Sequence, residues 1–405
     1  MNQEIKTPNF NKTLNEILDN LQPHQKTCQQ CQNVFDIFAE DIEFYKMLQV
    51  PEPKLCPECR SQNRRAFTNY TTFYKRKCDA PNHSEKIISQ IPENTCFPVY
   101  DNDYYWSDNW DPMDYGKDYN FSKPFFEQFK KLLDEMPQPA TTRDPKSINS
   151  EYTSYGVELK DCYYIFGGLK GENISYGNWP VLTKDSMDIL VASNSERCYE
   201  VVSVTNCYNC KFSYFSNYCL DSIFIYDCHN CQNCFSCVNL RNKNYYFFNE
   251  ALTKEEYKKK IKSIDLSDRE ILFEYQKRFF KLLEISPKRN VFNKNSINSI
   301  GTLLYNCKDC FKCFWAQNSE NVRFSSLIIN LKDCMDVMGV YSNSCYFGIV
   351  IIGSRIYFSA NTRDQSLEVE YSINCRNCSN CFGCIGLNKT GLTQFNQKMA
   401  KVSEN

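Results

Sequence analysis

Residues 160–195 read KDCYYIFGGLKG, ENISYGNWPVLT and KDSMDILVASNS when they are cut every twelve residues. The third position of these blocks holds Cys162, Ile174 and Ser186, and an Asp or Asn precedes it each time. The frame continues to residue 243 and returns from Lys308 as KDCFKCFWAQNS, ENVRFSSLIINL and KDCMDVMGVYSN. A fixed period of short apolar runs separated by Asn, Asp and Ser is typical of a repeat architecture built from strands.

Cysteines follow a stricter rule inside this repeat. The nine cysteines from 162 to 237 differ by multiples of three, and two later groups keep the same spacing. One residue is dropped after Cys334, so we place Cys345, Tyr357, Val369 and Cys381 at equivalent positions. We predict a β-solenoid, similar to a right-handed parallel β-helix, over residues 151–250 and 300–388, with 12 or 24 residues in each coil. Asn and Asp would form a ladder at one corner, while Cys and Ser would fill the interior.

Other segments interrupt the repeat. A capping box at Thr253 and Glu256 begins a helical region that extends to about residue 283, and we expect it to pack outside the solenoid. A second amphipathic helix begins at Ser122. The predicted fold is therefore mainly β with α. Its parts are an N-terminal helical extension (1–27), a zinc-ribbon module (28–121), a helix and linker (122–150), the first solenoid part (151–250), a helical insertion (251–299), the second solenoid part (300–388) and a tail (389–405).

Composition limits the function. The chain has 405 residues, a net charge of −1, 24 cysteines and three histidines. It contains no run of 18 apolar residues and no signal-peptide core, so we expect a cytoplasmic protein without a membrane role, in which cysteines bind metal or pack as free thiols. No GxGxxG, GxxxxGK[ST], HExxH or GxSxG motif occurs, and no catalytic residue is identified, which favours a protein without enzymatic activity.

The strongest motif is a pair of CxxC knuckles near the N-terminus. Cys28 and Cys31 form the first pair, and Cys56 and Cys59 form the second after 24 residues. Four thiolates at this spacing are typical of a structural zinc site, which takes tetrahedral sulfur ligands and keeps no open position. We predict one zinc ion at these four cysteines.

The residues around the knuckles resemble a known family. The stretch CQQCQNVFDIFAEDIEFY at 28–45 and the stretch VPEPKLCPECR at 50–60 are similar to trcl-type zinc ribbons. Residues 28–137 and the C-terminal repeats are similar to uncharacterised zinc-ribbon proteins from candidate-phylum bacteria, with further signatures in FYKRKC at 73–78 and WSDNWDP at 106–112. The resemblance implies a zinc ribbon but no activity. It also implies a second pair of knuckles, which this chain lacks except for Cys78.

Two further metal sites are considered. The first is a substitute mixed site at Cys78, His83, Cys96 and Asp101, against the alternative that a lost site is replaced by packing. The second is a thiolate cluster that would bind zinc or iron–sulfur, at either of two runs spaced by three residues. These runs are Cys228, Cys231, Cys234 and Cys237, and Cys375, Cys378, Cys381 and Cys384. Because both runs lie on the repeat grid, packing is the favoured interpretation.

Three functions remain open. A basic strip interleaved with aromatic residues predicts contact with RNA or single-stranded DNA. Its members are Arg60, Arg64, Arg65, Lys75, Arg76 and Lys77. The acidic loop 101–118 would instead neutralise this strip. A protein-binding scaffold is the second function, and a carbohydrate-binding or carbohydrate-active β-helix is the third. The carboxylates that would serve the third are Asp185 with Asp188, and Asp364 with Glu368 and Glu370. Oligomeric state is left open.

Overall fold

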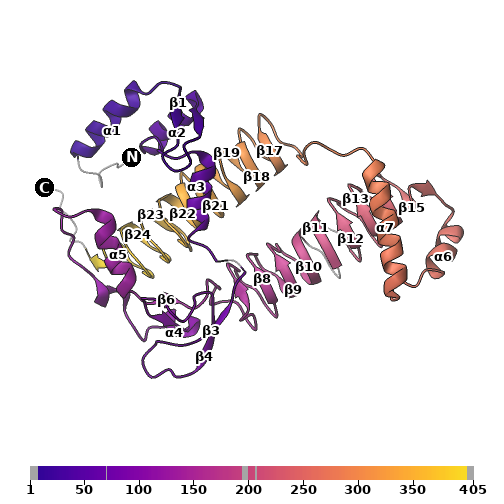
Figure 1. Cartoon of the computed structure of the whole chain (residues 1–405), viewed down its shortest axis with the longest axis horizontal. Helices are drawn as coiled ribbons and strands as arrows, with labels where there is room; N and C mark the ends of the chain where they lie inside the picture. Colours follow the sequence, from indigo (N-terminus) through magenta and orange to yellow (C-terminus); the bar gives the residue numbers. More distant parts are fainter. Residues whose placement is uncertain (1–7, 70, 194–198, 206–207, 399–405) are drawn as a thin grey trace. The chain divides into compact units, whose positions relative to one another are not determined.

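The computed structural model describes residues 8–69, 71–193, 199–205 and 208–398, and within these ranges the protein is mainly β with seven α-helices (Figure 1). It forms two compact units. Unit 1 contains residues 1–69, 110–137 and 291–405, and unit 2 contains residues 70–109 and 138–290. The module predicted at 28–121 is thus divided between the units. Compactness depends on contacts between distant segments, which a linear division of the chain does not show.

Unit 2 is dominated by one ten-stranded sheet in which successive strands are neighbours and pair in parallel up to the final antiparallel hairpin. Pairs such as Tyr163 with Ser175 and Lys211 with Ile223 are twelve residues apart, so the period is 12 and not 24. The strands are β7 (Thr153–Ser154), β8 (Tyr163–Phe166), β9 (Glu172–Asn178), β10 (Lys184–Ser193), β11 (Tyr199–Thr205), β12 (Lys211–Tyr214), β13 (Ile223–Tyr226), β14 (Gln232–Val238), β15 (Asn244–Phe247) and β16 (Glu250–Ala251).

Backbone geometry explains why the cysteines differ by multiples of three. Along the stack every third residue has a φ near +50°, as at Glu158, Asp161 and Tyr164. The residue that follows such a position points inward and is buried over most of the stack, as Cys162 is, but not at its end, where Lys243 is exposed. Among residues that carry a side chain, Asn and Asp tolerate this left-handed conformation best. Their side chains form the predicted ladder, in which Asn149 donates to Asp161 (2.9 Å), Asn173 to Asp185 (2.6 Å) and Asn209 to Asp221 (2.7 Å).

Unit 1 contains a second parallel stack with a less regular period. Met335 pairs with Tyr346 eleven residues later, whereas Ile356 pairs with Val369 thirteen residues later. The predicted inward position of Tyr357 is therefore wrong by one residue, since Ile356 is the fully buried side chain. The strands are β17 (Ile300–Tyr305), β18 (Phe311–Gln317), β19 (Glu320–Arg323), β20 (Ser326–Ile329), β21 (Lys332–Asn343), β22 (Tyr346–Tyr357), β23 (Ser366–Glu370), β24 (Ser379–Phe382), β25 (Gly391–Gln394) and β26 (Gln397–Lys398).

Both stacks end in the same way. Asn249 accepts from the Val238 N–H (2.8 Å) and donates to the Val238 carbonyl (3.0 Å), and Asn396 does the same with Ile385 (2.9 and 2.8 Å). Each asparagine lies at the turn of an antiparallel hairpin, β15–β16 or β25–β26. Its amide replaces the backbone groups that a further turn would supply, and so protects the exposed edge of the stack.

The helical insertion packs on the outer side of the unit 2 stack, as predicted. It forms α6 (Lys254–Lys262) and α7 (Arg269–Ile285), and the Thr253–Glu256 capping box is present. Phe279 of α7 is fully buried and its ring lies 5.8 Å from that of Phe224. The unit also contains β3 (Tyr74–Lys77), β4 (Lys86–Ser89), β5 (Val99–Tyr100), α4 (Asn102–Tyr105) and β6 (Gln138–Pro139). Because β6 is buried against β5, the start of the predicted linker is part of the core.

Unit 1 begins with a small α/β module. Its elements are α1 (Pro8–Asn20), β1 (His24–Thr27), β2 (Val34–Ile37), α2 (Ala39–Leu48) and α3 (Pro57–Arg65). The helix predicted from Ser122 is α5 (Phe125–Glu135), which begins three residues later with Pro124 at its N-cap, because the Ser122 hydroxyl donates to Asn120 instead. Phe125 and Phe129 of α5 pack with Phe395 and cover the end of the unit 1 stack.

Candidate metal centre

The four predicted cysteine ligands meet at one point. Cys28 and Cys31 lie in the turn of the β1–β2 hairpin, Cys56 caps α3, and Cys59 lies in the first turn of that helix. Their sulfur atoms all lie within 4.8 Å of one another, and Cys31 Sγ is 3.8 Å from Cys56 Sγ. Cys28, Cys56 and Cys59 are buried, while Cys31 is exposed. The local fold therefore buries three of the four cysteines and leaves Cys31 at the surface.

Backbone amides point at these sulfur atoms. The Cys56 N–H donates to Cys28 Sγ (3.3 Å) and the Cys59 N–H donates to Cys56 Sγ (3.5 Å). Burial opposes ionisation, but amide hydrogen bonds from Cys31, Cys56 and Gln30 lower the pKa of Cys28 to about 6. Burial and the neighbouring thiols raise the pKa of Cys59 to about 12. Four thiols this close resist joint ionisation unless a cation compensates the charge.

The geometry fits a tetrahedral tetrathiolate metal ion. With Zn–S bonds of about 2.3 Å, adjacent sulfurs of a tetrahedron lie about 3.8 Å apart, which is the Cys31–Cys56 separation. Four sulfur ligands leave no position for water or substrate, so a metal here would stabilise the fold and supply no catalysis. Cys28, Cys31, Cys56 and Cys59 would hold it.

The helix that carries two of the ligands is anchored to the stack by a buried ion pair. Arg60 Nε donates to Asp336 Oδ2 (2.6 Å) and Arg64 Nη1 donates to Asp336 Oδ1 (2.8 Å). The Asp336 side chain is fully buried in β21, and the arginine side chains are 3% and 8% exposed. Their guanidinium groups also lie over the rings of Phe324 and Phe347. The cysteine site and the stack are therefore joined through α3.

A second buried pair links the same module to the stack. Arg323 Nε of β19 donates to Asp41 Oδ1 of α2 (2.7 Å), and both side chains are buried. Sequence reasoning missed Asp41, Arg323 and Asp336. The available signal was weak: Asp336 interrupts the apolar run around Met335, Val337 and Met338, which marks an inward or covered carboxylate.

The basic strip is not a continuous exposed surface. Arg60 and Arg64 belong to the anchor described above, and Arg76 is buried and bonded to Asp79 (2.7 Å) and to the Pro92 carbonyl (2.7 Å). Arg65, Lys75 and Lys77 are exposed. Arginine suits the buried positions because the several N–H groups of its guanidinium donate to a carboxylate and to a backbone carbonyl at the same time. The sequence pattern did not distinguish these two groups.

The mixed set at Cys78, His83, Cys96 and Asp101 is engaged in other contacts. Cys78 Sγ accepts from the Asp101 N–H (3.2 Å), and the Asp101 carboxylate caps α4. The ring of His83 pairs with Glu85 (2.6 Å). The ligand atoms of these four residues do not all meet within 4.8 Å, whereas those of Cys28, Cys31, Cys56 and Cys59 do, among the described residues.

The repeat cysteines point into the stacks. Those that are described make a weak S–H contact to a carbonyl of their own turn, and most also contact a carbonyl of the next turn, as Cys228 does with Tyr226 and Cys237 (both 3.5 Å). The hydrogen bond with Cys231 and burial raise the pKa of Cys228, and contact with Cys378 and burial raise that of Cys375. Hydrogen bonds from the neighbouring cysteines lower the pKa of Cys231, and those from Cys375 and Cys381 lower that of Cys378 to about 4. Among the described residues, neither run has ligand atoms that meet within 4.8 Å as those of the N-terminal cysteines do, which favours packing. Cys198 and Cys207 lie outside the described residues.

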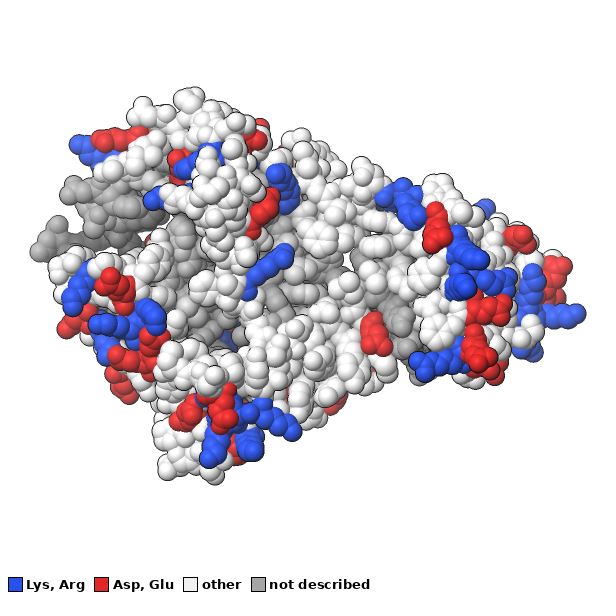
Figure 2. Space-filling view, viewed as in Figure 1, with Lys and Arg blue, Asp and Glu red and all other residues white. Residues whose placement is uncertain are grey.

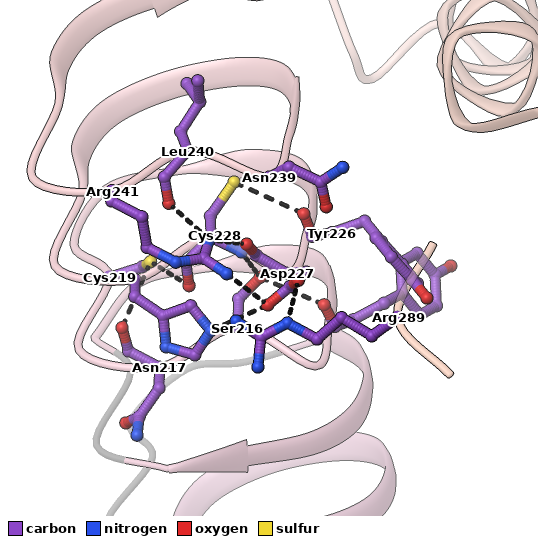
Figure 3. Close-up of polar contacts among 12 residues, drawn as sticks. Ser216, Asn217, Cys219, Tyr226, Asp227, Cys228, Asn239, Leu240, Arg241 and Arg289 are labelled. Carbon is purple, nitrogen blue, oxygen red and sulfur yellow. Dashed lines mark hydrogen bonds and ion pairs between the residues drawn. The ribbon is translucent and has the colours of Figure 1, made fainter. Parts of the chain in front are cut away.

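Unit 2 contains its own buried carboxylate (Figure 3). Asp227 is 2% exposed and receives Arg289 Nε (2.7 Å), Arg241 (2.9 Å) and His229 Nε2 (2.8 Å). Burial opposes its ionisation, but His229 and the two arginines lower the pKa of Asp227. Arg289 follows α7, so this contact fixes the chain where it leaves the helical insertion.

At least three of the five carboxylates proposed for carbohydrate chemistry have structural partners. Asp185 belongs to the asparagine ladder through Asn173, and Glu368 pairs with Arg355 (2.6 Å). Asp364 lies 3.7 Å from Arg376. These contacts give no geometry of an acid and base that flank a substrate.

Comparison of the chain with models of known families, with curated proteins and with solved structures finds no match. In the part of the chain that is described, every helix is too short or too polar to cross a lipid bilayer. The class of site is therefore defined by its geometry alone: a group of four cysteines suited to a metal ion, on a mainly parallel β protein.

Proposed function

We propose that the protein is a non-enzymatic zinc-binding scaffold, in which a zinc ribbon built around residues 28–59 is fixed to a right-handed β-solenoid. The approach of the four sulfur atoms within 4.8 Å carries the proposal. Membership of the zinc-ribbon proteins that residues 28–137 resemble is part of it. The ion orders the N-terminus of α3, and α3 in turn presents Arg60 and Arg64 to Asp336.

The scaffold would act by binding a partner. In unit 1, Arg65 is an exposed cation at the end of α3, and in unit 2, Lys75 and Lys77 are exposed cations on β3. These exposed cations support contact with RNA or single-stranded DNA, and a protein partner is the alternative outcome. The closed donor set gives the ion a structural role in either case.

Elemental analysis of the full chain tests the metal. We expect one zinc per chain, lost when Cys56→Ser and Cys59→Ser are combined, because two ligands cannot replace four. Cys96→Ser is the matched control, since Cys96 is an exposed cysteine outside the site. Loss of zinc should also expose α3 to proteolysis, because its first turn is held by the ligands. A wild-type protein without zinc, or a double variant that retains it, would contradict the proposal.

A further inference from the structure

The helical pair α6–α7 and the residues next to it carry an excess of positive charge, of which Arg289 is paired with Asp227. Residues 251–290 contain eleven Lys and Arg against seven Asp and Glu. Several acidic groups are occupied at helix starts, where Glu256 bonds Thr253, Asp265 bonds Ser267 and Asp268 caps α7. Figure 2 shows basic side chains, with acidic ones among them, over this end of unit 2.

Besides Lys254 at the start of α6, five exposed lysines of the pair are free of ion pairs among the described residues. They are Lys258, Lys259, Lys262, Lys277 and Lys281, and no carboxylate of the described residues lies within ion-pair distance of them. Some other exposed lysines of the same unit are paired. Lys160 and Lys184, for example, both bind Glu172, at 2.7 and 2.9 Å.

Aromatic rings lie between these lysines. Phe273 is 57% exposed and Phe280 is 41% exposed. With Lys277 and Lys281 they follow spacings of four, seven and eight residues, so all four share the outer face of α7. The opposite face, with Tyr275 and Phe279, packs on the sheet. Rings and ammonium groups therefore share one surface over about 12 Å, which also carries the carboxylates of Glu270, Glu274 and Glu284.

We propose that α6–α7 binds single-stranded nucleic acid, with the lysines contacting phosphates and Phe273 and Phe280 stacking on bases. Every base offers a ring face, so this pairing of groups suits a strand of any sequence. A membrane surface fits less well, because α7 uses its apolar stripe against the sheet and has only two separated rings outside. The inference rests on the nucleic-acid version of the proposed function and assigns the contact to unit 2, whereas the cysteine site belongs to unit 1.

Fluorescence anisotropy of labelled oligouridine with the full-length, zinc-loaded protein tests the inference. Binding should weaken as salt rises. Lys277→Gln with Lys281→Gln should flatten the salt slope by about 1.4, since each lost phosphate contact contributes about 0.7 for single strands. Phe273→Ala should raise Kd by roughly 5- to 150-fold through lost stacking. Lys277→Arg with Lys281→Arg should restore the slope.

The control is Lys308→Gln with Lys332→Gln, which removes two lysines that are paired with Glu320 and should leave the slope unchanged. Circular dichroism checks that each variant is folded. Absence of binding at low salt, or binding only to vesicles that contain phosphatidylserine, would overturn the inference. So would binding that is insensitive to the α7 variants but lost on replacing Arg65, Lys75 and Lys77 by Gln. Zinc content, measured separately, shows whether the proposed scaffold fails independently.

Discussion

The two parallel stacks use the same inward cysteines and the same asparagine caps, but they differ in regularity. The described turns of unit 2 advance by twelve residues, whereas those of unit 1 include steps of eleven and thirteen. The shorter step follows Asp336, which receives Arg60 and Arg64, and the longer step follows Gly353. Steps of eleven residues also occur at the start of this stack, where Ile300 pairs with Phe311, so the irregular register is a property of the unit 1 stack as a whole.

The two units also differ in how their buried carboxylates are paired. Asp336 and Asp227 both bind two arginines, but the partners of Asp336 are buried and those of Asp227 are 32–42% exposed. A charge without access to water depends entirely on its partner, whereas a partly exposed one is rehydrated when its partner is removed. The anchor of the cysteine module should therefore be the more sensitive of the two.

Replacing these carboxylates should have the largest effect. Asp336→Ala leaves two arginines buried without a counter-charge and should lower the free energy of unfolding by about 3–5 kcal/mol. Asp227→Ala should cost about 1 kcal/mol, because its partners regain water. Urea unfolding at neutral pH measures both. Equal losses in the two variants would show that burial of the partners does not control the anchors.

Replacing the glycine at the thirteen-residue step should give the second largest loss of stability. Gly353 has a φ of +148°, and a Cβ there would lie 2.2 Å from the Ser366 carbonyl oxygen. Gly353→Ala should therefore destabilise unit 1 by about 1–3 kcal/mol. Gly177→Ala in the regular stack is the control, since its Cβ would meet only the end of the Ile165 side chain at 3.1 Å. A thermal melt in which both variants lose the same stability would remove the link between glycine and irregular register.

The sequence predicted the features that depend on neighbours along the chain. The twelve-residue period, the asparagine ladder, the Thr253 capping box and the meeting of four cysteines all follow from local spacing. The anchors did not, because Arg60 and Asp336 are 276 residues apart and nothing local distinguishes a buried arginine from an exposed one. The inward position of Ile356 was missed for a related reason. Ile356 and Tyr357 are both apolar, so only the thirteen-residue step decides which one is buried.

Replacing the glutamates that bridge lysines on the surface of the two stacks should give the smallest loss of stability. Glu172 bridges Lys160 (2.7 Å) and Lys184 (2.9 Å), whereas the equivalent Glu320 lies 3.1 Å from Lys308 and 3.7 Å from Lys332. Hydrogen bonds and charge from Lys160 and Lys184 lower the pKa of Glu172 to about 2. A folded pKa below the unfolded value of about 4.3 means that the stabilisation is complete above that value and is lost as pH falls towards 2.

Glu172→Gln should therefore lower the unfolding midpoint slightly at pH 7, and the difference from wild type should vanish as pH falls from about 5 towards 2. Glu320→Gln should have a smaller effect, because its second lysine is farther away. Both differences should shrink in high salt, since these side chains are solvent-exposed. Urea titrations at several pH values measure the comparison. A Glu172→Gln deficit that persists at the acidic end would mean that packing, and not charge, makes that ladder stabilising.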